Sequence, residues 1–363
     1  MKKSKKLLIL CPYPYDVAPS QRLKFEQYYD SIRDAGYVIT ISPFISKRFW
    51  KIIYKRGHYL EKFFYTFLGY LRRIADLFRI PFYDVIYVHL WVTPFGFTFF
   101  ERLTIFLSKR AIYDIDDMIY LKEHKSKANP LISALKGKSK PIYLFRKSDY
   151  VLTSTDAIAD FAEQMNSKVI RIPISVNTGI YTPKTVYETK EKKLVLGWTG
   201  SFTTAPYLHL LDNILRTLAK EVDFKLLVMG DESFTLDGVE VKAIPWKAEY
   251  EVSVIRDFDI GLYPMPNNDL FATGKGGGKA LQYMSLGVPT VATALGPNYK
   301  IITHGQDGFL VQHEDEWICT LKQLIHDSAL RKKIGQAGVR TIEEKFSVNA
   351  NKEKYIKVLD GQF

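Results

Sequence analysis

DIGLYPMPNNDLFATGKGGGKALQYMSLGVPTVATALGPNYKIITHGQDGFL, residues 259–310, is the stretch that decides the fold of this chain. It joins a strand-like start to a glycine- and lysine-rich loop, and Ala280–Leu286 then reads as a helix. A Gly-Val-Pro sequence at 287–289 ends that helix, and Thr290–Thr293 reads as a short buried strand. This order places the loop at a helix N-terminus, where it can bind an anion.

The loop sequence GKGGGK is suited to a phosphate group. The glycines that let the backbone approach a ligand closely are Gly274, Gly276, Gly277 and Gly278. Lys275 and Lys279 add positive charge, so a nucleotide diphosphate would fit there. The alternative is a flexible glycine loop with solvated lysines, because a short glycine motif alone has low specificity.

The downstream segments extend the pattern, with QYMSLGVPTVAT at 282–293, GPNYKIITHG at 296–305 and QDGFLV at 306–311. Together they resemble the donor-binding domain of family-four glycosyltransferases, which are retaining enzymes of the GT-B fold. Members of that family often read E-A-M-A-x-G-x-P-V-V-A-S here, followed by G-x-x-E-x-(I/V)-x-x-G-x-(N/T)-G-x-L. The resemblance covers most of residues 190–345 and, more loosely, the first half of the chain.

This chain departs from the family at its acidic pair. The two glutamates of the family fall on Gly274 and Gln282, and neither position is acidic here. In the family the second glutamate commonly holds the donor ribose, a task that a glutamine carbonyl can share because it also accepts hydrogen bonds. The resemblance therefore implies donor binding by Gln282, and no role is carried over from the missing first glutamate.

Length and composition predict a two-domain protein. With 363 residues and 47% hydrophobic side chains, the chain can build two cores. Cys11 and Cys319 give no metal spacing or disulfide framework, which fits a reducing, cytosolic compartment. We expect no membrane span, since no apolar stretch approaches about 18 residues. The net charge of +12 favours an anionic partner: phospholipid, nucleotide or nucleic acid.

The N-terminus reads as a βαβ unit. Lys6–Leu10 is strand-like, an amphipathic helix follows from about Gln21 to Ala35, and Tyr37–Ile41 is the next strand. Later strand-like runs are 84–90, 111–115, 150–153 and 169–172, then 194–198, 224–229, 239–244 and 259–262. We expect an α/β fold of two Rossmann-like, doubly wound domains facing a cleft, the GT-B architecture.

The expected domain division has four parts. They are an N-terminal acceptor-side domain (1–181) with a basic aromatic insertion at about 44–83, a polar linker (182–193), a C-terminal nucleotide-sugar domain (194–346) and a final helix (347–363). The family resemblance implies that the final helix packs back onto the first domain.

Two further segments are candidates for donor contacts. Gly200 and Ser201 follow the first strand of the second domain, where a turn of small residues can aim amides at a phosphate. Trp246 follows another strand, and its indole face could stack on a nucleobase. The alternatives are an ordinary strand-to-helix turn and a tryptophan of the core or surface.

The first domain offers polar groups at its strand ends. Asp116 and Asp117 follow a predicted strand and could orient or deprotonate an acceptor hydroxyl. A metal-binding D-x-D is a second interpretation, which the GT-B pattern argues against, and a helix cap or ion pair is a third. The acceptor-side candidates are His89, Ser20 and Arg22; a structural histidine and an exposed arginine are the alternatives.

Residues 44–83 combine basic and aromatic side chains in a helix-compatible pattern. Such a sequence can lie in the headgroup layer of an anionic membrane. The candidate membrane residues are Lys47, Arg48, Trp50, Lys51, Lys55, Arg56, Arg72 and Arg73. A core-facing aromatic stripe with a solvated basic face is the alternative, and no nucleic-acid-binding motif accompanies the patch.

The sequence thus predicts a glycosyltransferase, and the family resemblance implies a retaining, metal-independent mechanism without a bound cofactor. It would move a sugar from a nucleotide diphosphate to a hydroxyl of a glycan or lipid-linked glycan in cell-surface polysaccharide synthesis, at the cytoplasmic face of the plasma membrane. Lys275 and Lys279 would stabilise charge on the leaving diphosphate. The alternatives are a GT-B sugar-nucleotide epimerase or phosphorylase, or a catalytically weak scaffold that binds sugar nucleotide or membrane.

Overall fold

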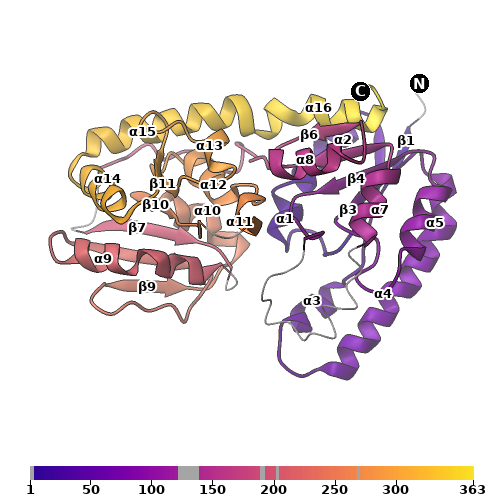
Figure 1. Ribbon diagram of the computed structural model, residues 1–363, viewed down its shortest axis with the longest axis horizontal. Helices are drawn as coiled ribbons and strands as arrows, with labels where there is room; N and C mark the ends of the chain where they lie inside the picture. The colour runs from indigo at the N-terminus through magenta and orange to yellow at the C-terminus, as the bar shows by residue number, and fades with distance from the viewer. Residues whose placement is uncertain (1–3, 122–138, 189–192, 202–203, 268–269) are drawn as a thin grey trace. The chain divides into compact units, whose positions relative to one another are not determined.

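The chain folds as two compact units, shown in the computed structural model (Figure 1). Unit 1 comprises Met1–Ile174 and Lys352–Phe363, and unit 2 comprises Ser175–Asn351. The structure describes residues 4–121, 139–188, 193–201, 204–267 and 270–363. Each unit contains one six-stranded parallel sheet, which confirms the α/β class with two Rossmann-like sheets.

The sheet of unit 1 has the strand order β2-β1-β3-β4-β5-β6. Its strands are β1 (Lys5–Cys11), β2 (Tyr37–Pro43), β3 (Val85–His89), β4 (Ala111–Ile115), β5 (Tyr150–Thr153) and β6 (Val169–Arg171). Every residue of β3, β4 and β5 is buried, as expected for central parallel strands covered on both faces. The chain reverses its direction of travel across the sheet between β1 and β3, which makes their carboxyl ends the expected ligand site of this unit.

The helices of unit 1 include one interruption that the sequence pattern did not show. They are α1 (Pro19–Arg22), α2 (Tyr29–Asp34), α3 (Lys47–Ile53), α4 (Tyr59–Arg79), α5 (Phe99–Leu107), α7 (Ser139–Lys147) and α8 (Asp156–Glu163). The single helix expected from Gln21 to Ala35 is wrong, because α1, a 3₁₀ turn (Phe25–Tyr28) and α2 replace it. At the break, Lys24 leaves helical geometry with φ −122° and ψ −106°, and its ammonium forms a buried ion pair with Asp114.

The chain returns to unit 1 at its C-terminus through α16 (Val348–Asp360). The Tyr355 ring stacks on Tyr28 with centroids 4.5 Å apart. The Asp360 carboxylate accepts a hydrogen bond from Lys5 Nζ at 2.6 Å. These contacts join α16 to β1 and to the 3₁₀ turn at Phe25–Tyr28.

The sheet of unit 2 has the strand order β12-β11-β10-β7-β8-β9. Its strands are β7 (Leu194–Thr199), β8 (Phe224–Met229), β9 (Val241–Ile244), β10 (Ile260–Tyr263), β11 (Thr290–Thr293) and β12 (Phe309–Val311). This is the doubly wound order in which the chain first builds outward through β8 and β9, then returns to build through β10 to β12. The reversal lies between β7 and β10, whose carboxyl ends are the expected ligand site.

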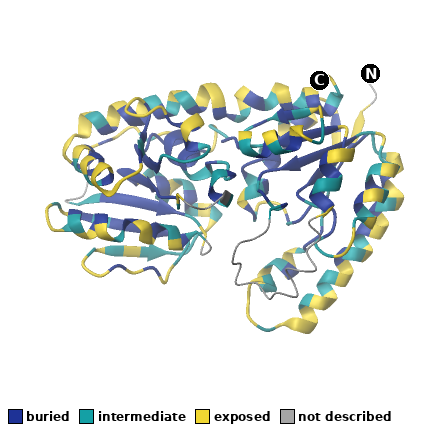
Figure 2. Ribbon diagram, in the orientation of Figure 1, coloured by how far each residue is buried: buried dark blue, intermediate teal, exposed yellow. Residues whose placement is uncertain are grey.

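Helices cover both faces of this second sheet. They are α9 (Asp212–Ala219), α10 (Ala248–Arg256), α11 (Leu270–Thr273), α12 (Gly278–Ser285), α13 (Asn298–Ile301), α14 (Glu314–His326) and α15 (Ser328–Thr341), with a 3₁₀ helix at Ala205–Leu211. Figure 2 shows buried strands inside each unit and exposed residues along the outer helical surfaces. One large apolar cluster joins α9 and α14 to the sheet.

Glycines on the central strands let α12 approach the sheet closely. A Cβ on Gly261 of β10 would lie 2.4 Å from the Tyr283 ring of α12. The Tyr283 hydroxyl in turn accepts a hydrogen bond from the Thr199 amide at 2.9 Å, at the end of β7. This packing fixes α12 beside the carboxyl ends of β7 and β10.

The polar segment expected to be a linker lies against unit 2 where it is described. Lys184 Nζ donates to the Phe258 carbonyl at 2.6 Å, and the Tyr187 hydroxyl lies 2.5 Å from the position of a Cβ on Gly287. Residues 189–192 of this segment are outside the described residues. Within the part of the chain that the structure describes, no helix is both long and apolar enough to cross a membrane.

Candidate functional site

The glycine-rich loop is packed tightly against α13 (Asn298–Ile301) and the loop before it. Gly277 caps α12 with a φ of +72°, and a Cβ there would lie 2.1 Å from Ile301 Cδ1. Gly296, in the loop before α13, has a φ of +52° and would place a Cβ 2.9 Å from Thr273 Cα. Side chains at either position would push the two loops apart. The sequence therefore uses glycine here to fix a loop at the N-terminus of α12.

Lys279 lies at the point where the strand order of unit 2 reverses. Its Nζ is 5.3 Å from the ring centroid of Trp198 in β7 and 5.4 Å from that of Tyr263 in β10. Two aromatic faces therefore hold the ammonium by cation–π attraction. No carboxylate forms an ion pair with Lys279 among the described residues, so its charge is available to a ligand.

The electrostatics of this lysine favour an anionic ligand. Burial, followed by repulsion from the nearby Lys275, lowers the pKa of Lys279 to about 7. The charged form is disfavoured because the aromatic surroundings replace water and supply no formal negative charge. A bound diphosphate would supply that charge, and the N-terminal amides of α12 would donate to the same oxygens.

Gly200 and Ser201 form the turn after β7, as the sequence indicates. Gly200 donates its N–H to the Met229 carbonyl at 3.0 Å, and its own carbonyl oxygen would lie 1.8 Å from a Cβ on Gly230. Ser201 is exposed, and its amide donates to Thr204 Oγ1 at 3.3 Å. The next two residues, 202–203, lie outside the described part of the chain.

Gln282 belongs to a buried polar network. Its amide nitrogen donates to Glu251 Oε1 at 3.1 Å and to the Tyr181 hydroxyl at 3.0 Å. The Trp246 indole N–H donates to the same carboxyl oxygen at 2.8 Å, and the Tyr181 hydroxyl donates to Glu251 Oε2 at 2.8 Å. Glu251, on α10, thus fixes both predicted donor contacts, Trp246 and Gln282, in one arrangement.

Replacing Glu251 by leucine is expected to lower the free energy of unfolding by roughly 3 kcal/mol, because two buried donors and the half-buried Trp246 indole lose their acceptor. Urea denaturation of the full-length protein measures this change. The conservative change Glu251→Gln keeps acceptor oxygen and should cost less. An unfolding free energy that is the same for Glu251→Leu and the native chain would contradict the network.

Unit 1 places a second polar cluster at the carboxyl ends of β3 and β4. His89 Nδ1 lies 2.7 Å from Asp114 Oδ2, and Lys24 Nζ lies 2.6 Å from Asp114 Oδ1. All three side chains are buried. Asp116, two residues further along, is also buried and directs Oδ1 toward His89 Nε2 across 3.8 Å.

The charges in this cluster set different states for the two aspartates. Burial alone would raise the pKa of Asp114, but the Lys24 ammonium and the His89 hydrogen bond outweigh it, so the pKa is lowered. Burial raises the pKa of Asp116 to about 6 despite the nearby His89 and Lys24. His89 Nε2 and Asp116 Oδ1 have no hydrogen-bond partner among the described residues. The pair therefore has unused hydrogen-bonding capacity in a buried setting.

The remaining acceptor-side candidates have less distinctive surroundings. The Asp117 carboxylate accepts a hydrogen bond from the Met118 amide at 2.9 Å, which is typical of a turn. Ser20 and Arg22 lie half-buried on α1. The structure therefore brings His89 and Asp116 together and leaves Asp117 facing its own turn.

The candidate membrane residues divide into three groups. Lys47, Arg48, Lys51, Lys55 and Arg56 are exposed, and Trp50 and Arg72 are half-buried. Arg73 is a correction, because it is buried and its Nη1 pairs with Asp76 Oδ2 at 2.9 Å. It faces the interior of unit 1 and cannot contact a headgroup.

Sequence reasoning missed Lys24, Asp114, Tyr181 and Glu251. Each acts through a partner that is distant along the chain, and no local motif marks the pairing. Asp114 does lie inside the acidic run that contains Asp116, and its place on a buried strand was an available signal. A charged residue on a fully buried strand requires a partner.

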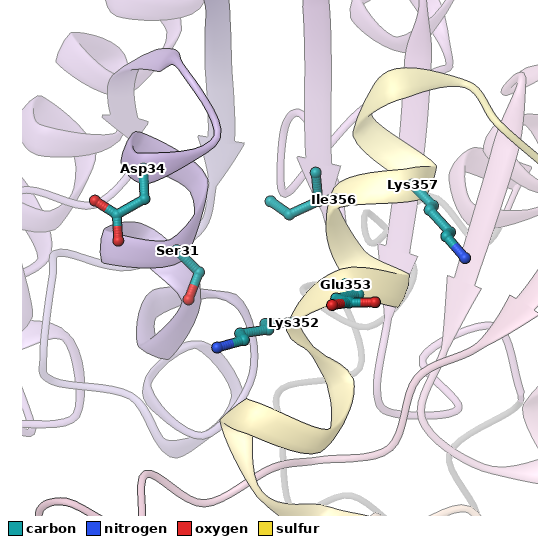
Figure 3. Close-up of a pocket in the computed structure, with 6 residues that line it drawn as sticks. All are labelled: Ser31, Asp34, Lys352, Glu353, Ile356 and Lys357. Atoms are coloured by element: carbon teal, nitrogen blue, oxygen red, sulfur yellow. The ribbon is translucent and has the colours of Figure 1, made fainter.

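A surface pocket of about 380 Å³ lies elsewhere in unit 1. Figure 3 shows its lining from α2 and α16: Ser31, Asp34, Lys352, Glu353, Ile356 and Lys357. Its charges are mixed and it offers no aromatic face, so we place no nucleotide there. Among the described residues, no group of three or more His, Cys, Asp or Glu side chains is arranged to hold a metal ion.

Comparison with known proteins identifies the class of unit 2. Residues 193–327 match the family model of group 1 glycosyl transferases. A capsular polysaccharide biosynthesis glycosyltransferase, CapM of Staphylococcus aureus, is 25% identical over 167 residues. That match covers 42% of this chain and 42% of CapM, so it spans less than half of either protein.

Solved structures match the whole fold at low sequence identity. HepE of Anabaena, in complex with UDP and glucose, has a TM-score of 0.69 at 16% identity, covering 98% of this chain and 100% of that one. A glycosyltransferase from Rickettsia africae has a TM-score of 0.71 at 12% identity, covering 100% and 99%. At these identities the likeness shows the fold.

The fold and the family model agree on one class. The fold is GT-B, and the resemblance to family-four glycosyltransferases is confirmed. Within unit 2, the likeness to group 1 glycosyl transferases covers residues 193–327.

Proposed function

We propose that this protein is a glycosyltransferase that moves a sugar from a nucleotide-diphosphate sugar to an acceptor hydroxyl. One observation carries the proposal: Lys279 lies between two aromatic rings at the strand reversal of unit 2, at the N-terminus of α12, without a carboxylate partner among the described residues. A cation in that setting fits a diphosphate. The group 1 family match of residues 193–327 supports the same chemistry.

The reaction exchanges one C–O bond for another. The bond between the anomeric carbon and the diphosphate breaks, and the acceptor oxygen forms a new bond to that carbon. Lys279 and the α12 amides stabilise the negative charge that develops on the leaving diphosphate. The acceptor proton passes to the Asp116 carboxylate, whose free Oδ1 faces His89.

The proposal extends to the mechanism, the acceptor and the location of the protein. We assign a retaining, metal-independent mechanism from the family resemblance and the basic donor loop. The acceptor is a glycan or lipid-linked glycan of a cell-surface polysaccharide, consistent with the likeness to CapM, a capsular polysaccharide biosynthesis glycosyltransferase. The protein would act as a peripheral protein at the cytoplasmic face of the plasma membrane.

Thermal unfolding with a panel of UDP, GDP, ADP and dTDP tests the donor site. We expect one nucleotide to raise the melting temperature selectively, because a ligand at about 100 times its dissociation constant stabilises by roughly 2.7 kcal/mol. UDP is the first candidate, since HepE was solved with it. The shift should disappear in Lys279→Met and persist in Lys332→Met, which changes an exposed lysine of α15.

Product analysis then tests sugar transfer, with nucleotide sugars of the nucleoside diphosphate that stabilises the protein as donors. A glycosylated acceptor, with nucleoside diphosphate released in equal amount, supports the proposal. Conversion of the donor without an acceptor indicates an epimerase, and release of a sugar phosphate indicates a phosphorylase. Binding without turnover over a broad acceptor panel indicates a scaffold. No thermal shift from a well-folded sample would refute the donor site.

A further inference from the structure

Helix α4 is amphipathic, and it presents its apolar face to solvent. The exposed apolar side chains of this face include Leu60, Phe63, Phe64, Phe67, Leu71, Ile74 and Phe78. Their spacing of three or four residues places them on one stripe along the 21-residue helix. Figure 2 shows the run of exposed positions along α4. A helix on the surface of a globular protein usually has the opposite arrangement, with its apolar residues facing the core.

The inward side of α4 carries a fixed polar network beside the aromatic contacts of Tyr65 and Tyr70. Arg73 donates to the carbonyls of Val92 and Cys11 at 2.8 and 3.0 Å and pairs with Asp76, which also accepts from Ser42 Oγ at 2.6 Å. Rotating the helix to bury the phenylalanines would expose this network and leave its polar groups without partners. The apolar stripe therefore cannot turn inward, and something outside unit 1 must cover it.

Glycine at the centre of α4 adds a second restraint. A Cβ on Gly69 would lie 2.6 Å from the Phe44 ring, so the helix backbone sits directly on that ring. The Tyr70 hydroxyl also donates to the Phe95 carbonyl at 2.9 Å. Exposed phenylalanines continue in that neighbouring segment, where Phe97 has 91% of its surface accessible. The apolar surface thus extends beyond α4 itself.

The charges around the stripe select its partner. Lys47, Arg48, Lys51, Lys55 and Arg56 are exposed on α3 and on the connection to α4, and Arg79 is exposed at the end of α4. Glu61 is the exposed acidic residue of α4. A second copy of this chain would bring like charges together, whereas anionic headgroups would neutralise them. Helix α4 carries six charged side chains among its 21 residues, as is typical of a helix that lies in the membrane–water interface.

We infer that the outward stripe of α4 inserts into the interfacial layer of a membrane with anionic headgroups, while the basic residues of α3 contact those headgroups. Hydrophobic insertion then contributes most of the free energy of membrane binding, and charge attraction adds to it. The inference rests on the proposed function in one respect: membrane binding would bring the enzyme to a lipid-linked acceptor. Vesicle binding needs neither donor nor acceptor, so its failure and the failure of sugar transfer are distinguishable.

The test is co-flotation of the full chain with vesicles of phosphatidylcholine alone or mixed with phosphatidylglycerol. We expect binding to the anionic vesicles that high salt weakens without abolishing. The variant Phe67→Ser/Leu71→Ser/Phe78→Ser should lower the apparent binding constant at least roughly tenfold, because each buried apolar side chain contributes that order. The matched control is Ile180→Ser/Tyr299→Ser, which removes two exposed apolar side chains of unit 2 and should bind normally.

Two further measurements keep the outcome decisive. Thermal unfolding checks that the triple variant is folded, and Phe67→Trp should show a blue-shifted emission change with anionic vesicles that is quenched by bromine-labelled lipid. Absence of native binding, or equal binding by the triple variant, would overturn the inference. Light scattering that shows a dimer broken by the triple variant, without vesicle binding, would assign the stripe to self-association instead.

Discussion

Replacing Lys279 by methionine is expected to abolish binding of a nucleotide-diphosphate sugar while leaving the unligated protein as stable as the native chain or more stable. Methionine keeps the apolar stem between Trp198 and Tyr263 and removes a charge that has no carboxylate partner among the described residues. The loss of a buried charge contact to the diphosphate should weaken donor binding at least about 100-fold. Isothermal titration measures this loss.

The stability change should have a defined pH dependence. Because the folded-state pKa of Lys279 is lowered to about 7, the unfolded chain binds more protons between pH 7 and the ordinary lysine range. The native protein is therefore expected to gain stability as pH rises through that window. The advantage of Lys279→Met, roughly 1–3 kcal/mol, should be greatest at or below pH 7 and vanish near pH 10.

Donor affinity should change with pH in the opposite sense. The diphosphate binds the charged form of Lys279, so affinity should fall as pH rises above about 7 in the native protein. A nucleotide sugar is the proper probe, because its diphosphate has no titration in this range. Lys332→Met should behave as the native chain. A pH-independent affinity together with full binding by Lys279→Met would contradict the assignment.

The strands of both sheets were predictable because their signal is local. Ala111–Ile115 and Thr290–Thr293 are short apolar runs bounded by polar or turn residues, and the structure has β4 and β11 at those bounds. A buried parallel strand needs a continuous apolar run, so the sequence determines its position without knowledge of its neighbours. The glycine-rich loop and the helix after it were predictable for the same reason.

The helix from Gln21 to Ala35 failed because a tertiary contact interrupts it. Its apolar periodicity is continuous, but Lys24 turns inward to pair with Asp114 on β4. One buried ion pair outweighs the small local preference for helix at a single lysine. Partners so far apart along the chain cannot be paired from one sequence, which also hid the contact of Glu251 with Gln282.

The sequence of residues 44–83 shows an amphipathic pattern, but it does not show which face of the helix packs on the protein. A periodic pattern gives two faces of a helix and leaves open which face contacts the rest of the protein. Arg73 illustrates the difference, since it reads as a surface cation and is buried by Asp76 and backbone carbonyls. The buried pair of Arg73 with Asp76 and the packing of Gly69 on Phe44 determine that the phenylalanine stripe faces outward.

The second large effect is expected at Asp116, where asparagine should reduce kcat for sugar transfer by roughly 100-fold or more while changing donor affinity little. Asp114 is held in its charged form, so in a neutral imidazole it accepts the Nδ1 hydrogen of His89 and leaves Nε2 as an acceptor. Asp116 Oδ1 lies 3.8 Å from Nε2, too far for a direct hydrogen bond, so Asp116 itself would take up the proton. Asparagine retains the shape of Asp116 and cannot accept that proton.

The pH profile distinguishes this chemical role from a structural one. Burial raises the pKa of Asp116 to about 6, and the carboxylate accepts a proton only in its ionised form. The native kcat/KM should therefore rise about tenfold per pH unit below 6 and level off above it, and Asp116→Asn should lack this limb. Asp30→Asn, whose side chain is 93% exposed, is the matched control and should keep the native profile.

Comparison with Asp117→Asn separates the two neighbouring carboxylates. Asp117 already accepts a hydrogen bond from the Met118 amide in its own turn. Asp117→Asn should therefore lower stability slightly and leave the fall of kcat/KM below pH 6 unchanged. Asp116, by contrast, has a buried oxygen without a partner among the described residues and a buried imidazole nitrogen facing it. An acidic limb that survives in Asp116→Asn and disappears in Asp117→Asn would transfer the proton-accepting role to Asp117.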